Sequence, residues 1–199
     1  GISMAQAVLP DRRHSDAQRL ERVGYRHATD LLYLVSQWGR SDVRPAEFDI
    51  DFVPYTHSDR QRLSAIVERT YADTLDVPAL NGVRDLEDIL NGYQLTGHFS
   101  PDRWFFLQSR GEDVGCLLLT DHPEQQQWEL VYMGIIPAAR GNGWGSQATR
   151  YAKQLAKAAG RERLILAVDA ANDPAVSTYT KAGFFELLRR SVYLKIFPA

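Results

Sequence analysis

The sequence predicts a mixed α/β fold in which helices flank both faces of one sheet. Two observations support this. Apolar residues recur with the period of a strand in some segments and of a helix in others, and the clearest helix pattern follows a strand through a glycine-rich turn. From residue 48 onward the expected order is strand, two helices, three strands, helix, strand, helix and two strands. Because strands and helices do not alternate uniformly, this order indicates a mixed sheet rather than a purely parallel one.

Composition and charge fit a single domain, or a domain with an appendage. The chain has 199 residues, 44% of them hydrophobic, and its formal net charge of −2 gives no support for a nucleic-acid or membrane-surface partner. No apolar run reaches the roughly 18 residues of a transmembrane span, and the first residues do not resemble a signal peptide. A single cysteine, Cys116, excludes an intrachain disulfide framework. We therefore expect a cytoplasmic protein, monomeric or homodimeric, with no nucleic-acid or membrane partner.

The beginning of the chain carries only short patterns. Residues 1–16 are polar and are expected to be loose, residues 17–22 fit a short helix, and residues 31–35 are typical of a strand. Residues 37–47 contain glycine, serine and proline and indicate a linker.

The central part of the chain should start with a strand at residues 50–55. Ser58 and Gln61 then fit a capping box that begins a helix, and Asn81-Gly82 separates this helix from a second one. The second helix is expected near residues 86–90, and three strands follow it, at residues 104–107, 114–120 and 129–136.

The clearest helix pattern begins after Gly145 and ends at Gly160, with apolar residues three and four positions apart. The remaining elements are a strand at residues 164–168, a helix at 174–182, and strands at 184–188 and 192–197. The first of these strands is uninterruptedly apolar, as expected where both faces of a strand are covered. Asp173-Pro174 and Gly183 are suitable start and stop signals for the helix.

The turn before the long helix has the chemistry of an anion site. Three glycines, Gly141, Gly143 and Gly145, alternate along it, and Arg140 precedes them. The start of a helix leaves main-chain N–H groups without partners at the positive end of the helix dipole, and glycine lets the backbone approach a ligand closely. The turn therefore predicts a pyrophosphate site.

A dinucleotide-binding Rossmann unit is an alternative, because it also needs a strand, glycines, a helix and then an acid, here Asp169. Three features speak against it. The third fingerprint position is Ser146, residues 137–140 separate the strand from the glycines, and only 30 residues follow Asp169. An NAD-dependent oxidoreductase is accordingly the weaker alternative.

Two blocks of the sequence resemble the GNAT acetyltransferases. The run Arg140-Gly-Asn-Gly-Trp-Gly145 matches the acyl-CoA signature of that family, Gln/Arg-x-x-Gly-x-Gly/Ala. Residues 168–184, with Asn172, Tyr179 and Gly183-Phe184, are similar to its second conserved block. The resemblance implies a largely antiparallel sheet whose fourth and fifth strands, here residues 129–136 and 164–168, splay apart to admit acetyl-CoA.

The resemblance also implies site residues. The main chain of the glycine turn would hold the pyrophosphate, main-chain groups of the fourth strand would pair with the pantetheine arm, and Asn172 would contact that arm from the other side. The implied acetyl-CoA-binding residues are Met133, Ile135, Ile136, Arg140, Gly141, Asn142, Gly143, Trp144, Gly145, Ser146, Asn172 and Tyr179. Asn172 also suits a plain turn, where asparagine is common.

The implied reaction is direct transfer of the acyl group to a primary amine of a small molecule or peptide. Such an amine must lose a proton, for which Glu129 is the candidate base, and the leaving sulfur needs a donor, for which Tyr179 is the candidate acid. A solvated glutamate and a core aromatic residue are the competing interpretations. No spacing of histidines suggests a metal site. A non-catalytic acyl-CoA-binding module on the same fold is the main alternative function.

The acceptor site is expected beside the two early helices. Its candidate apolar residues are Tyr71, Leu75, Tyr93, Phe99 and Trp104, and packing in the core is the competing and favoured interpretation for each.

Residues 20–34 and 180–194 repeat one pattern of helix, Gly-aromatic, strand and Tyr-Leu. We interpret residues 1–47 as an extension, with a linker, that is a remnant of a preceding GNAT domain, and residues 48–199 as the acyltransferase domain. Chance similarity of short amphipathic segments is the alternative. The interpretation predicts that residues 31–35 pair with the main sheet.

Overall fold

The structure, a computed structural model, describes residues 3–38, 47–80, 82–83 and 85–197. Most of the expected linker therefore lies outside the described residues. The strands are β1 Met4–Leu9, β2 Arg26–Gln37, β3 Asp51–Pro54, β4 Trp104–Ser109, β5 Glu112–His122, β6 Gln127–Ile135, β7 Arg163–Asp169 and β8 Phe185–Ile196. The α-helices are α1 Ser15–Arg22, α2 Arg60–Tyr71, α3 Leu86–Leu95, α4 Trp144–Ala158 and α5 Asp173–Lys181. Short 3₁₀ turns lie at His57–Asp59, Pro78–Leu80, Pro101–Arg103, Pro123–Gln125 and Pro137–Ala139.

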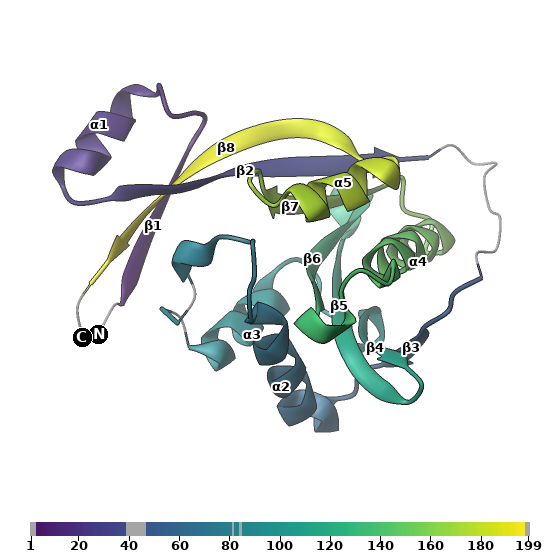
Figure 1. The fold of residues 1–199 in the computed structure, drawn as a ribbon. Helices are drawn as coiled ribbons and strands as arrows, with labels where there is room; N and C mark the ends of the chain where they lie inside the picture. Colours follow the sequence, from purple (N-terminus) through teal and green to yellow (C-terminus); the bar gives the residue numbers. More distant parts are fainter. Residues whose placement is uncertain (1–2, 39–46, 81, 84, 198–199) are drawn as a thin grey trace.

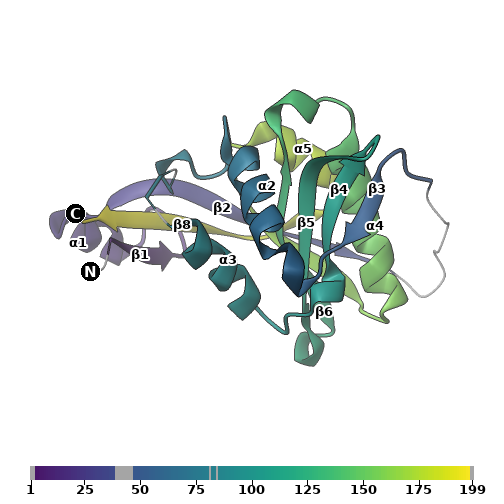
Figure 2. The ribbon, with the colours of Figure 1, turned by 90° about the horizontal axis from the view of Figure 1, so that it is seen from below.

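The strands form one eight-stranded sheet in the order β1-β8-β2-β7-β6-β5-β4-β3. All neighbours are antiparallel except β6 and β7, which are parallel. Helices α2 and α3 lie on one face of the sheet and α4 and α5 on the other, while α1 packs at the far end beside β1 and β8 (Figures 1 and 2). The predicted mixed sheet with helices on both faces is confirmed.

The main core lies between the central strands and the helices of both layers. Trp104 and Phe106 on β4 and Leu63 on α2 are almost completely buried on one face. On α4, Ala148, Ala152 and Ala156 are fully buried, as the apolar stripe of this helix predicts. A second, small core forms from Leu9, Ala17 and Tyr193, where α1 covers the end of β8.

The parallel pairing of β6 and β7 is short, and this creates the splay that the fold predicts. It runs only from Gln127–Leu130 against Arg163–Leu166. Beyond Leu130 and Leu166 the two strands separate, and the edge of β6 is left open. The expected divergence of these strands is therefore confirmed.

Two expectations about the ends of the chain were wrong. Residues 4–9, expected to be loose, form β1, which pairs along its whole length with Ser191–Ile196 of β8. The two closing strands expected at residues 184–188 and 192–197 are one continuous strand, β8. In both cases the order comes from a partner that is distant in sequence, which local polarity does not reveal.

The repeat seen in the sequence corresponds to a structural repeat. The unit β1–α1–β2 has the same order as β7–α5–β8, and Gly24 and Gly183 both end their helices with positive φ, +90° and +84°. Each unit gives its last strand to the other: β8 pairs with β1, β2 pairs with β7, and β2 and β8 lie side by side. The expected pairing of residues 31–35 with the main sheet is confirmed, because β2 lies between β8 and β7.

Candidate functional site

The glycine turn lies open at the start of α4. Gly141 and Gly143 are exposed, and their φ angles of +84° and +77° are in the left-handed region that glycine favours. The backbone ladder of the helix starts with Gln147, whose N–H donates to Gly143 O at 3.1 Å. The amides of Trp144, Gly145 and Ser146 precede this ladder, so the described turn presents main-chain N–H groups at the positive end of α4.

A cleft of about 450 Å³ runs from this turn into the gap between β6 and β7. Of the residues expected to bind the cofactor, those lining the cleft are Met133, Ile135, Arg140, Gly141, Gly143, Trp144, Gly145, Ser146, Asn172 and Tyr179. The side chain of Asn142 is instead turned back to Ala139 O, to which its Nδ2 donates at 3.0 Å. Ala167 on β7 is exposed, although its strand was expected to be covered on both faces, because it faces this cleft.

The open edge of β6 supplies main-chain groups to the cleft. The N–H of Ile136 donates to Val114 O on the β5 side at 2.9 Å, and Ile136 O accepts from Ala139 N at 2.9 Å. Ile136 therefore offers no free main-chain group, and its expected role is not supported. Because alternate residues of an antiparallel strand point to opposite edges, Met133 and Ile135 direct their main-chain groups away from β5.

The guanidinium of Arg140 is engaged with the backbone rather than free to face a ligand. Its Nε donates to Ile135 O at 3.1 Å, and its Nη atoms donate to the carbonyl oxygens of Thr70, Ala72 and Asp73 at 2.8–3.0 Å. These carbonyls end α2 and start the loop that follows. Arg140 thus ties the glycine turn to that loop, which borders the cleft.

Helix α5 presents two of the expected residues to the cleft. Asn172 is its N-cap, and its Oδ1 accepts from Ala175 N at 3.3 Å, while its amide nitrogen makes no hydrogen bond among the described residues. Tyr179 is 6% exposed, lines the cleft, and its hydroxyl has no hydrogen-bond partner within the described part of the chain. Burial, together with the charge of Asp76, raises the pKa of Tyr179, so the phenol stays protonated.

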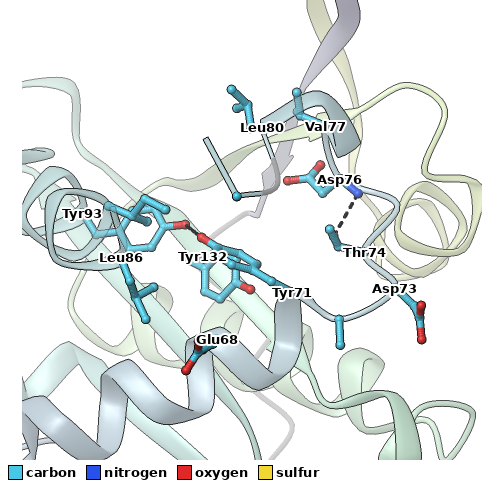
Figure 3. Close-up of a pocket in the computed structure, with 13 residues that line it drawn as sticks. Glu68, Tyr71, Asp73, Thr74, Asp76, Val77, Leu80, Leu86, Tyr93 and Tyr132 are labelled. Atoms are coloured by element: carbon cyan, nitrogen blue, oxygen red, sulfur yellow. Dashed lines mark hydrogen bonds between the residues drawn. The ribbon is translucent and has the colours of Figure 1, made fainter. Parts of the chain in front are cut away.

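A second cavity of about 600 Å³ adjoins the cleft on the side of α2 and α3 (Figure 3). Asp73, Thr74, Asp76 and Tyr132 line both spaces, so the two adjoin. Among the expected acceptor residues, Tyr71 and Tyr93 line this cavity and Leu75 lines the cleft.

The expectation that Phe99 and Trp104 line the acceptor site was wrong. Their rings pack edge-to-face with centroids 4.7 Å apart, and Trp104 is fully buried in the core. A buried aromatic of the core and one of a pocket give the same sequence signal.

Asp169 and Asp76 hold the loop after α2 against the end of β7. Asp169 is 2% exposed, and its carboxylate accepts hydrogen bonds from Thr29 Oγ1, from Ala171 N at 2.8 Å and from Val77 N at 3.0 Å. In a dinucleotide-binding Rossmann unit this carboxylate would accept hydrogen bonds from the ribose of the cofactor. Here the carboxylate of Asp169 already accepts hydrogen bonds from these internal donors.

The family comparison decides between the alternatives. The sequence profile of the acetyltransferase (GNAT) family matches residues 72–184, more than half of the chain. This chain belongs to the GNAT family of acetyltransferases.

Curated relatives support the assignment over shorter stretches. A mycothiol acetyltransferase from Streptomyces bingchenggensis is 32% identical over 102 residues, covering 51% of this GNAT chain and 32% of the relative. One from Corynebacterium efficiens is 37% identical over 90 residues, covering 45% of this chain and 30% of the relative. The matched stretches span about a third of the length of these relatives.

Solved structures show the GNAT fold over nearly the whole chain. A GCN5-related N-acetyltransferase from Sphaerobacter thermophilus superposes with a TM-score of 0.72 at 18% identity, covering 97% of this chain and 59% of that one. A chain of the NatC complex, solved with Gag peptide and CoA, has a TM-score of 0.54 at 12% identity and covers 76% of this chain. At these identities the likeness concerns the fold alone.

The remaining expected residue of this GNAT chain, Glu129, lies at the closed end of the splay. It sits opposite Ile165 where β6 and β7 still pair, and its Oε2 is 2.8 Å from His122 Nε2. Glu129 is not among the described residues that line the cleft or the second cavity.

Asp76 lines both spaces of this GNAT chain and was not among the site residues expected from the sequence. The only local signal was an acid in the short segment Thr74-Leu-Asp-Val77 between two expected helices. Its significance comes from Asp169, a partner far along the chain.

None of the described helices is long and apolar enough to cross a membrane.

Proposed function

We propose that this chain transfers an acetyl group from acetyl-CoA to a primary amine by direct attack in a ternary complex. The observation that supports this most is the junction of two spaces. The cleft that starts at the amides of α4 shares Asp76 and Tyr132 with a second cavity of about 600 Å³, which is large enough for a small molecule.

The chemistry of the cleft fits acetyl-CoA. The amides that precede the α4 ladder suit a diphosphate, and a Cβ built at Gly143 meets no atom within 4 Å, so the approach to the turn is open. The main-chain groups of Met133 and the N–H of Ile135, whose carbonyl is engaged by Arg140, suit the amides of a pantetheine arm, with Asn172 on the opposite wall. Acetyl-CoA supplies the electrophilic thioester carbonyl.

Tyr179 is the proposed acid for the leaving sulfur. Its hydroxyl is buried, protonated and not engaged with another described residue, so it retains a proton to donate. The main-chain N–H of Met133, on the open edge of β6, is the proposed donor to the carbonyl oxygen. The proton of the amine has two candidate acceptors, Glu129 and Asp76.

Release of free thiol from acetyl-CoA in the presence of amines tests the proposal. We expect turnover with at least one amine and calorimetric binding of CoA. Because the curated relatives are named for mycothiol, mycothiol without its acetyl group belongs in the amine panel. CoA binding without turnover for any amine would favour a non-catalytic acyl-CoA-binding module, and absence of CoA binding would contradict the proposal.

We further propose that residues 1–47 are the remnant of a preceding GNAT domain and that residues 48–199 form the acyltransferase domain. The exchange of last strands between β1–α1–β2 and β7–α5–β8 supports this. The shift in residue number from Tyr33 to Tyr193 is the same as the shift from Val8 to Val168 and from Leu32 to Val192. In the sheet, Val8 pairs with Val192 and Leu32 pairs with Val168, so the two strand pairings have the same register. A chance resemblance does not require equal registers in the two pairings.

A further inference from the structure

We propose that the second cavity takes a positively charged amine with an aromatic-sized apolar body and no carboxylate, and that Asp76 receives its ammonium group. This inference rests on the proposed acetyl transfer and specifies its acceptor. Its central residue, Asp76, was not among the site residues expected from the sequence.

The walls of the cavity are apolar and aromatic. Tyr71, Tyr93 and Tyr132 line it, together with Leu86 and Ile89. The rings of Tyr93 and Tyr132 stack with centroids 5.3 Å apart, and Tyr71 meets Tyr132 edge-on at 5.7 Å. Aromatic faces attract organic cations as well as apolar groups.

The phenol groups of these tyrosines are satisfied by one another and by α2. Tyr71 Oη and Tyr93 Oη are 3.0 Å apart, and Tyr132 Oη is 2.7 Å from Thr70 Oγ1. Burial raises the pKa of Tyr93 and of Tyr132 well above the ordinary value, so both remain neutral. The cavity therefore offers ring surface rather than free donors, which suits a hydrocarbon or aryl group.

The ionisable groups around the cavity favour a cation. Among the described lining residues, the charged side chains are Glu68, Asp73 and Asp76, and none is a lysine or arginine. An acceptor with a carboxylate would place a negative charge beside these acids without a cationic partner in the described lining. The repulsion between that carboxylate and the acids of the lining selects against anionic acceptors.

Asp76 is an acid that lines both the cavity and the cleft. Its Oδ1 accepts the N–H of Asp169 at 3.0 Å, its own N–H donates to Thr74 Oγ1 at 3.1 Å, and its Oδ2 has no partner among the described residues. Figure 3 shows its carboxylate directed into the cavity, whereas that of Asp73 points to the other side. The loop thus fixes one oxygen of Asp76 and leaves the other for a ligand.

The surroundings also suit Asp76 as a proton acceptor. Desolvation by the cavity walls, with the nearby charge of Asp169, raises the pKa of Asp76 above its ordinary value. The charge of Asp76 in turn contributes to the raised pKa of Tyr179, so the two side chains are within electrostatic reach of each other. A candidate base, Asp76, lines both spaces, and a candidate acid, Tyr179, lines the cleft.

The step balances with these two residues. Asp76 takes one proton from the ammonium, and the neutral nitrogen forms a bond to the acyl carbon while the carbon–sulfur bond breaks. Tyr179 gives its proton to the sulfur and recovers one from water, and the nitrogen loses its second proton to water. Asp76 then releases its proton to water, so the products are the amide, the free thiol and one proton.

A matched pair of amines tests the acceptor class. Phenethylamine and phenylalanine share the aryl-ethylamine skeleton, and only the second carries a carboxylate. We expect kcat/KM for phenethylamine to exceed that for phenylalanine by about tenfold or more, and calorimetric binding to the CoA-saturated protein to show the same order. Equal or reversed preference would overturn the class while leaving acetyl transfer intact, and CoA that does not bind at all would instead overturn the proposed function.

Asp76→Asn tests the residue, because the amide oxygen of asparagine can still accept the N–H of Asp169. We expect phenethylamine to bind about tenfold more weakly or worse, and kcat to fall by about 100-fold, with an unchanged Kd for CoA. The matched control is Asp102→Asn, an exposed acid outside both spaces, which should change none of these values. If Asp76→Asn behaves like this control, Asp76 does not receive the amine.

Discussion

The main-chain N–H of Asp169 donates a 3.0 Å hydrogen bond to Asp76 Oδ1, while the carboxylate of Asp169 accepts a 3.0 Å bond from Val77 N. Together these bonds join the loop after α2 to the end of β7. Because Thr29 Oγ1 also donates to Asp169, which lies 140 positions later in the sequence, a residue of β2 supports this junction. The segment before residue 48 is therefore part of the structure that shapes the site.

Thr29→Val should weaken this support. It removes one donor from a buried carboxylate, which should lower the free energy of unfolding by roughly 1–3 kcal/mol. Because the loop carries Asp76, kcat/KM for the amine should fall while the Kd for CoA stays constant. Urea denaturation and steady-state kinetics measure the two effects. Thr29→Ser, which keeps the hydroxyl, should recover most of both, and a serine variant as impaired as the valine variant would contradict the role of this bond.

Arg140→Ala should loosen the contact between the glycine turn and the end of α2. The side chain donates to four main-chain carbonyls, so its loss should cost roughly 1–2 kcal/mol in thermal or urea unfolding. Arg140→Lys should recover little, because a single ammonium cannot span the carbonyls that the planar guanidinium reaches. We expect KM to rise for both substrates, since the residue connects the two spaces. A rise for acetyl-CoA alone would indicate a direct phosphate contact instead.

Tyr179→Phe should separate chemistry from binding. The variant keeps the ring that packs near Phe184 and loses only the donor to sulfur. We expect kcat to fall by about 100-fold, in the range of general acid catalysis, with an unchanged Kd for CoA by calorimetry. A normal kcat in this variant would remove Tyr179 from the mechanism.

Asp30 should make stability depend on acid pH. Burial alone would raise its pKa, but hydrogen bonds from Ser191, His27 and Arg12 outweigh this and lower the pKa to about 2. The pKa in the folded state thus lies below the unfolded value of 3.8, so the stabilisation is present above pH 4 and is lost as the pH falls toward 2. Since solvent borders this cluster, we expect its charge to contribute roughly 1 kcal/mol.

Comparison with Asp30→Asn isolates this contribution from other acids. The variant should be less stable than wild type at pH 7, and the difference should shrink as the pH falls from about 5 to 2. Urea denaturation at each pH measures it. A difference that is independent of pH would show that the ionisation of Asp30 does not matter.

The elements that the sequence predicts well are those with local signals. The apolar stripe of α4 and the turn between Gly141 and Gly143 each depend on residues within a few positions of one another. The N-cap of α5 was expected at Asp173 and is Asn172, one position earlier. The divergence of β6 and β7 follows from the family resemblance, which matched in two separate blocks.

The features that the sequence did not reveal depend on distant partners. Residues 4–9 become a strand only because the end of β8 offers an edge, and Asp76 gains its orientation only from Asp169. The opposite error occurred at Trp104 and Ile136, where a suitable residue type is used by the core or by a neighbouring strand. Local chemistry indicates which groups are able to act, and the pairing of distant segments determines which are free to do so.

Calorimetric titration of CoA into two glycine variants tests the central claim most directly. Gly143 and Gly160 lie at opposite ends of α4, have φ angles of +77° and +74°, and have open space where a Cβ would stand. Glutamate should therefore strain both positions similarly, by about 1 kcal/mol, but only Gly143→Glu places a carboxylate beside the amides that precede the helix. We predict that Gly160→Glu binds CoA with the wild-type Kd and that Gly143→Glu binds it at least about tenfold more weakly. Equal affinity in the two folded variants would contradict binding of acyl-CoA at this turn.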